Sequence, residues 1–89
     1  MNKLNSIKKA CKINNIIFKE IINDFNFKTE KDISNYIKKR FNEFKVKASY
    51  PSIVANNNKT IHAKPRNKKL ERGFLILDFG CKYNSYCSD

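Results

Sequence analysis

The chain has 89 residues, enough for one small domain near the lower limit for a self-sufficient core, and its formal net charge of +11 comes from Lys far more than from Arg. Its three cysteines are an odd number without metal-type spacing, which excludes a disulfide framework and indicates a reducing compartment, so we expect a cytoplasmic protein. The N-terminal region is broken by Lys and Asn, and no apolar run approaches a membrane span. We therefore expect neither a signal peptide nor a membrane partner.

A first amphipathic helix is predicted near the N-terminus, where lysines lie opposite an apolar stripe of helical spacing. Ser6 is a plausible N-cap, and the short polar side chains of residues 23–26 predict the end of the helix. We expect this helix to cover a sheet and to take no part in chemistry. The stripe consists of Ile7, Ala10, Cys11, Ile17, Ile21 and Phe25.

A second helix is predicted from Thr29 to about Phe44. Thr29 is a candidate N-cap, and Asp32 three residues later gives a variant of the capping box. Glu30 in the first turn suits the positive end of the helix dipole. We expect this helix to be scaffold as well. Its apolar stripe consists of Ile33, Ile37, Phe41 and Phe44, with Tyr36 beside it.

The rest of the chain has the pattern of strands and turns. Residues 50–55 predict a strand that is entered through Pro51, and the asparagine-rich residues 56–60 predict a turn. The nearly unbroken apolar run 74–79 predicts a buried strand, and the Gly and aromatic residues that follow predict a turn and a second strand. Together these elements predict an α+β fold in which two N-terminal helices pack on a small antiparallel sheet.

Two aspartates stand at equivalent places in the predicted hairpin. With its turn centred between Tyr83 and Asn84, Asp78 lies directly opposite Asp89, where cross-strand Cβ atoms are about 4.5–5.5 Å apart. Two carboxylates at that separation repel, and one must hold a proton unless a cation lies between them. A divalent metal with oxygen ligands is the usual reason for such a pair, although two incidental surface aspartates are the alternative.

The same residues carry a family resemblance. Leu77-Asp78-Phe79-Gly80, Tyr83 and Tyr86-Cys87-Ser88-Asp89 resemble the first metal-binding hairpin of the pita-bread (creatinase/aminopeptidase) metallopeptidases, including the eleven-residue step between the aspartates. This group contains methionine aminopeptidase, aminopeptidase P and the Xaa-Pro dipeptidases, and the hairpin is most similar to the proline-specific branch. Further similar segments are Lys9-Ala10-Cys11-Lys12-Ile13, Thr29-Glu30, Tyr50 to Ala55 and Leu70-Glu71-Arg72-Gly73.

The resemblance implies half of a pita-bread fold and a metal-dependent peptidase of Xaa-Pro type, with a peptide as substrate. It implies two divalent ions, manganese or cobalt, with Asp78 on one ion and Asp89 bridging both. His62 would contact the substrate and stabilise developing negative charge, since Thr60-Ile61-His62 with Pro65 fits the family pattern. Without the resemblance, a lone His in a polar loop is usually just solvated. The sequence departs from the family in having Ala63 where a second His is common.

The resemblance also implies ligands that the 89 residues do not contain, because the family takes a His and two Glu from a second half of the domain. We therefore expect residues 1–89 to be a single truncated domain that binds metal at most weakly by itself. It would hydrolyse N-terminal peptide bonds only when a complementary chain completes it. A catalytically inactive remnant or binding module is the first alternative.

A small basic nucleic-acid-binding protein is the second alternative, suggested by charge alone. The most basic segment holds the candidate phosphate contacts Lys64, Arg66, Lys68 and Lys69. Leu70 and Glu71 interrupt it, and no aromatic residue is interleaved to stack on bases. A solvated loop is the favoured interpretation, and specific nucleic-acid binding is not expected.

Overall fold

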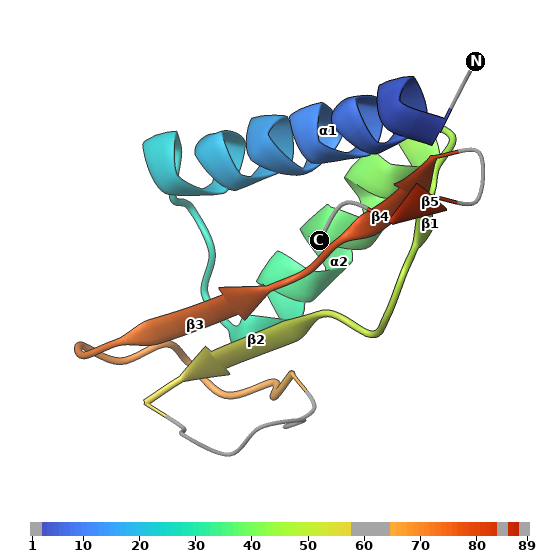
Figure 1. Cartoon of the computed structure of the whole chain (residues 1–89). Helices are drawn as coiled ribbons and strands as arrows, with labels where there is room; N and C mark the ends of the chain where they lie inside the picture. The colour runs from blue at the N-terminus through green and yellow to red at the C-terminus, as the bar shows by residue number, and fades with distance from the viewer. Residues whose placement is uncertain (1–2, 58–64, 84–85, 88–89) are drawn as a thin grey trace.

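The computed structural model describes residues 3–57, 65–83 and 86–87. Two helices lie on the same side of a set of short antiparallel strands (Figure 1), which confirms the predicted α+β class. Within the described residues, neither helix is both long and apolar enough to cross a membrane. The elements in chain order are α1 (Lys3–Asn23), α2 (Glu30–Glu43), β1 (Lys47–Ala48), β2 (Ile53–Asn56), β3 (Leu75–Asp78), β4 (Cys81–Tyr83) and β5 (Tyr86–Cys87).

Helix α1 ends at Asn23, as predicted, but it starts earlier and buries a different stripe. Because the helix begins at Lys3, Ser6 lies within it as a fully buried residue and is not its N-cap. Ile13 belongs to the buried stripe, whereas Phe25 follows the helix and is 46% exposed. The buried stripe therefore consists of Ser6, Ala10, Ile13, Ile17 and Ile21, at the spacing of one helical face.

Helix α2 has the predicted start. The Thr29 hydroxyl accepts a hydrogen bond from the Asp32 backbone N–H, and the Asp32 carboxylate accepts one from the Thr29 backbone N–H, which completes the capping box. The helix ends at Glu43 with Phe44 as its C-cap, and Lys45 then takes a left-handed conformation with φ 59°. Such a C-terminal position usually holds Gly, so Lys45 carries backbone strain.

The core lies between the helices and the strands. Ile33, Ile37 and Phe41 of α2 are buried as predicted, while Phe44 and Tyr36 are partly buried against the same cluster. The remaining buried apolar residues of this cluster are Ala10, Ile13, Ile17, Ile21, Val46, Val54, Phe79 and Cys81. Burial of these side chains, at about 25 cal/mol for each Å² of apolar surface, is the main force that holds the helices on the strands.

The strands form two antiparallel groups, β2–β3 and β1–β4–β5. Strand β3 leads into β4 in nearly the same direction (Figure 1), with Phe79 and Gly80 between them. On the partner strands, residues 49–52 separate β1 from β2. These four residues lie opposite the two residues Phe79 and Gly80, which separate β3 from β4. Pro51 lies in this bulged segment, where its missing N–H breaks no ladder bond.

Two expectations about the strands are wrong. The run 74–79 is not a buried strand, because β3 alternates between partly buried and exposed residues. The hairpin register also differs, since Lys82 pairs with Cys87, two positions beyond the partner that the predicted turn would give it. A shift of two positions keeps each side chain on its face of the strand and moves it along the strand.

Candidate metal-ligand face and a buried carboxylate

Of the two predicted metal ligands, the structure describes Asp78. It lies on the open face of β3, which is the face that the helices do not cover. Leu75 and Leu77 pack against the core, and side chains alternate along a strand, so Ile76 and Asp78 face away from the helices. Asp78 pairs with Ile53 of β2 and is exposed. The Tyr50 hydroxyl donates a hydrogen bond of 2.7 Å to Asp78 Oδ1. The carboxylate is thus held at one oxygen on an accessible face.

Asp89, His62 and Lys64 lie outside the described residues, so the convergence of Asp78 with Asp89 and the place of His62 stay predictions. The donor chemistry of Asp78 suits a divalent ion, because carboxylate oxygens are the ligands such ions prefer. One carboxylate is not a metal site, however. Across residues 3–57, 65–83 and 86–87, no group of three or more His, Cys, Asp or Glu residues comes together to hold a metal ion.

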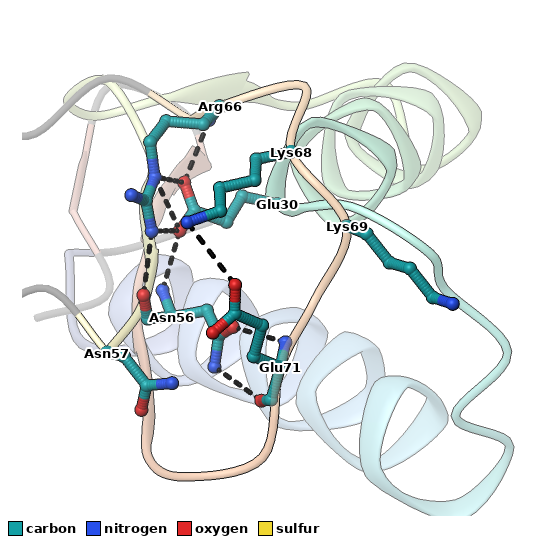
Figure 2. Close-up of a pocket in the computed structure, with 7 residues that line it drawn as sticks. All are labelled: Glu30, Asn56, Asn57, Arg66, Lys68, Lys69 and Glu71. Atoms are coloured by element: carbon teal, nitrogen blue, oxygen red, sulfur yellow. Dashed lines mark hydrogen bonds and ion pairs between the residues drawn. The ribbon is translucent and has the colours of Figure 1, made fainter.

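A second carboxylate, Glu30, lies at the start of α2 and is only 2% exposed. Its Oε2 accepts a 2.7 Å hydrogen bond from the backbone N–H of Asn56. Its Oε1 accepts a 2.8 Å hydrogen bond from the backbone N–H of Arg66. The Arg66 guanidinium also donates to both oxygens, with Nη2 to Oε2 at 2.7 Å (Figure 2). This buried charge is therefore fully partnered.

These contacts determine the ionisation of Glu30. Burial alone would raise its pKa, because it penalises the charged form. The hydrogen bonds from the Arg66 side chain and from the two backbone N–H groups outweigh burial and lower the pKa from 4.5 to about 2. The same pairing raises the pKa of Arg66. Glu30 is therefore an ionised structural anchor at neutral pH.

Asn56 and Asn57 extend the network to the segment that leads into β3. The Asn56 side-chain amide accepts from the Glu71 backbone N–H at 2.7 Å and donates to the backbone oxygens of Glu71 and Phe74. Asn57 has φ 56°, a left-handed conformation that Asn adopts more readily than most residues. Its side chain donates to the Arg72 carbonyl and accepts from the Phe74 N–H.

Two cations of the basic segment pair with carboxylates around this network. The cluster lines a small polar pocket of about 210 Å³ (Figure 2), in which Arg66 pairs with Glu30 and Lys68 Nζ lies 3.3 Å from Glu71 Oε1. Lys69 points away from the cluster (Figure 2). Two of the four cations named for nucleic-acid contact are therefore partly neutralised, and the charge available to phosphate is smaller than the sequence suggests.

Sequence reasoning missed the role of Glu30. It attributed Glu30 to the helix dipole, which accounts for its place at the N-terminus of α2 but not for its burial. The partners Asn56 and Arg66 lie 26 and 36 residues further along the chain, beyond any local pattern. The one available signal was that Thr29-Glu30 and Leu70-Glu71-Arg72-Gly73, which follows the basic segment, both resemble the family.

Comparison with known proteins adds the last observation. The model of metallopeptidase family M24 matches residues 5–89 of the chain. No curated protein and no solved structure matches the chain. The matched residues include both predicted ligands, Asp78 and Asp89, and His62.

Proposed function

The chain belongs to metallopeptidase family M24, and on that premise we propose that it forms the first half of a catalytic domain that hydrolyses N-terminal peptide bonds with divalent metal ions. The observation that carries the proposal is the place of Asp78. It ends β3 on the face that the helices leave open, within reach of solvent, and its Oδ1 is held by Tyr50. A solvent-accessible carboxylate that is oriented by a hydrogen bond suits the role of a metal ligand better than the role of a core residue.

We assign the following roles to residues of this chain. Asp78 and Asp89 bind the metal ions, and the Tyr50 hydroxyl fixes the orientation of Asp78. His62 contacts the substrate and donates to the oxygen that gains negative charge. The ions, when bound, supply Lewis acidity and lower the pKa of water. The further His and two Glu ligands of the family are not among these 89 residues, and other sequence on the same or a second polypeptide supplies them.

The proposed substrates are peptides with Pro in the second position. The support is the similarity of Asp78-Phe79-Gly80 and Tyr86-Cys87-Ser88-Asp89 to the proline-specific branch. Manganese and cobalt are the proposed ions, and the cytoplasm is the proposed location. An inactive remnant that keeps the fold is the second candidate.

Metal titration tests the proposal at its ligands. We would titrate manganese and cobalt by calorimetry into the wild type, into the double variant Asp78→Asn with Asp89→Asn, and into Asp24→Asn. Asp24 is an exposed carboxylate at the end of α1, so its variant controls for the loss of charge alone. Binding at about millimolar or tighter that vanishes only in the double variant supports the ligand assignment.

A second step separates an enzyme from a remnant. The 89-residue chain is mixed with a second half that carries the missing His and Glu, and the mixture is assayed on Xaa-Pro and on Met-initiated peptides. Hydrolysis of the Xaa-Pro peptide that is lost with Asp78→Asn supports the proposed function. A folded mixture that binds no metal and hydrolyses neither peptide refutes it and leaves the remnant. Hydrolysis of the Met peptide alone corrects the substrate.

A further inference from the structure

The side chain of Asn56, the last residue of β2, is buried and makes three hydrogen bonds to the segment that leads into β3. We propose that Asn56 is a positioning residue that fixes the register of β3 against β2 and thereby the place of Asp78 along its strand. The inference rests on the proposed function in giving Asp78 a role with metal. The register itself is a property of the fold, and its test needs no metal.

Two common sources of strand register do not act on β2 and β3. A tight turn does not join them, because eighteen residues, 57–74, separate the two strands. The neighbouring ladder does not set their register either. Residues 49–52 lie opposite only Phe79 and Gly80, and this bulge separates the pairing of β1 with β4 from the pairing of β2 with β3. The register therefore depends on the contacts of the two strands and of the residues beside them.

The apolar pattern of β3 excludes some registers but not all. Leu75 and Leu77 pack against the core, so a shift by one position would turn them to the open face. A shift by two positions keeps them on the covered face and moves Asp78 along the strand by about 7 Å. That shift would take Asp78 from its partner Ile53 and from the Tyr50 hydroxyl, which donates a 2.7 Å hydrogen bond to Oδ1.

Asn56 distinguishes these registers, because the hydrogen bonds of its side chain are specific to one of them. Its oxygen accepts a 2.7 Å hydrogen bond from the Glu71 N–H, and its NH₂ group donates to the carbonyl oxygens of Glu71 at 3.1 Å (Figure 2) and of Phe74 at 3.0 Å. Asn56 is 7% exposed, so a register without these partners would leave buried polar groups unpaired, which is unfavourable. A single buried Asn fixes the register of coiled coils for the same reason.

The segment that Asn56 binds is held by its neighbours as well. The Asn57 side chain donates to the Arg72 carbonyl at 2.8 Å and accepts from the Phe74 N–H at 3.0 Å. Leu70 N–H donates a 2.7 Å hydrogen bond to the Lys28 carbonyl, which joins the segment to the chain before α2. Phe74 directly precedes β3, so these bonds determine where the strand begins.

NMR of the isotope-labelled 89-residue chain tests the register directly. Cross-strand nuclear Overhauser contacts between the backbones of Ile53 and Asp78 report the register of the structure. Contacts from Ile53 to Ile76 or to Gly80 report a shift by two positions in either direction.

We would compare the wild type with Asn56→Leu and Ile17→Val. Asn56→Leu keeps a side chain of similar volume and removes its three hydrogen bonds. Ile17→Val is the control for a general loss of stability, because Ile17 is fully buried in α1, which packs on β4 and β5. The expected result is that Asn56→Leu loses Ile53–Asp78 contacts and gains shifted ones, whereas Ile17→Val keeps the wild-type contacts.

A second measurement links the register to the ligand. In calorimetry, Asn56→Leu should bind manganese about tenfold more weakly than Ile17→Val does, because a shifted Asp78 is not oriented by Tyr50. Unchanged manganese affinity in a shifted Asn56→Leu overturns the link to Asp78. A wild type that binds no manganese but shifts its register with Asn56→Leu refutes the metal role of Asp78 and leaves the register role of Asn56 standing.

Wild-type contacts alone in a folded Asn56→Leu overturn the proposal, and so does the same shift in Ile17→Val. If Asn56→Leu does not fold, Asn57→Gly decides by the same contacts. This variant keeps the left-handed backbone at φ 56° and removes the two side-chain hydrogen bonds to residues 72–74. It should show shifted contacts beside the wild-type ones, and their absence overturns the proposal.

Discussion

Replacing Glu30 with Gln tests how far the buried carboxylate stabilises the fold. The substitution keeps the shape of the side chain, removes its charge and places an NH₂ group where one oxygen accepts from Asn56 or Arg66. A hydrogen bond to a charged group contributes about 1.5–3 kcal/mol. The Arg66 side chain is 40% exposed, so solvent screening reduces its part of the loss. We expect the free energy of unfolding to fall by about 3 kcal/mol at pH 7.

The pH dependence gives the same magnitude independently. The pKa of Glu30 is about 2 in the fold against an ordinary value of 4.5, so the fold favours the ionised form. A depression of that size corresponds to about 3 kcal/mol of stability, present in full above the ordinary pKa and lost as the pH falls towards about 2. Arg66 is the cation that faces Glu30, and Glu71, which also faces Arg66, is paired with Lys68. The difference between wild type and Glu30→Gln should therefore shrink to about 1 kcal/mol at pH 3.

Urea unfolding followed by far-ultraviolet circular dichroism measures both quantities, because two helices dominate the signal. Glu20→Gln is the control at pH 7, and its partly exposed ion pair predicts a loss of about 1 kcal/mol or less. Equal urea midpoints for wild type and Glu30→Gln at pH 7 would refute the reasoning. A gap that stays constant from pH 7 to pH 3 would show that Glu30 does not titrate as the structure requires.

Three further substitutions have defined outcomes. Lys45→Gly should raise the free energy of unfolding by about 1 kcal/mol in the same urea assay, because Gly takes the left-handed C-terminal position without strain. Gly73→Ala should lower it by about 1–3 kcal/mol, since Gly73 has φ 136° and a Cβ there would overlap the Asn57 side-chain oxygen; an unchanged urea midpoint would contradict this. Tyr50→Phe should weaken metal binding about tenfold in calorimetry without unfolding the protein, because it frees Asp78 Oδ1 from the hydroxyl; equal affinities would remove the orienting role of Tyr50.

The sequence by itself determined the two helices, their place before the strands and the family-like residues; it did not predict β1. Local rules govern these features: the hydroxyl of Thr29 and the carboxylate of Asp32 define a helix start within one turn, and Ile33, Ile37 and Phe41 repeat at the helical period. The structure was needed to place Asp78 on the open face of β3, because only the fold shows that the helices cover one face of that strand and leave the other exposed. An apolar run in the sequence predicts a strand but does not reveal which face of that strand is exposed to solvent.

Only the tertiary structure decided the hairpin register, the buried stripe of α1 and the role of Glu30. Ser6 and Ile13 are buried because the strands that α1 packs on set which side of the helix is covered, and the periodicity of the helix allows neighbouring choices. Glu30 became an anchor because folding brings the N–H groups of Asn56 and Arg66 to it from 26 and 36 residues away. A carboxylate acquires a low pKa from partners in space, and sequence spacing does not encode such partners beyond the local turn.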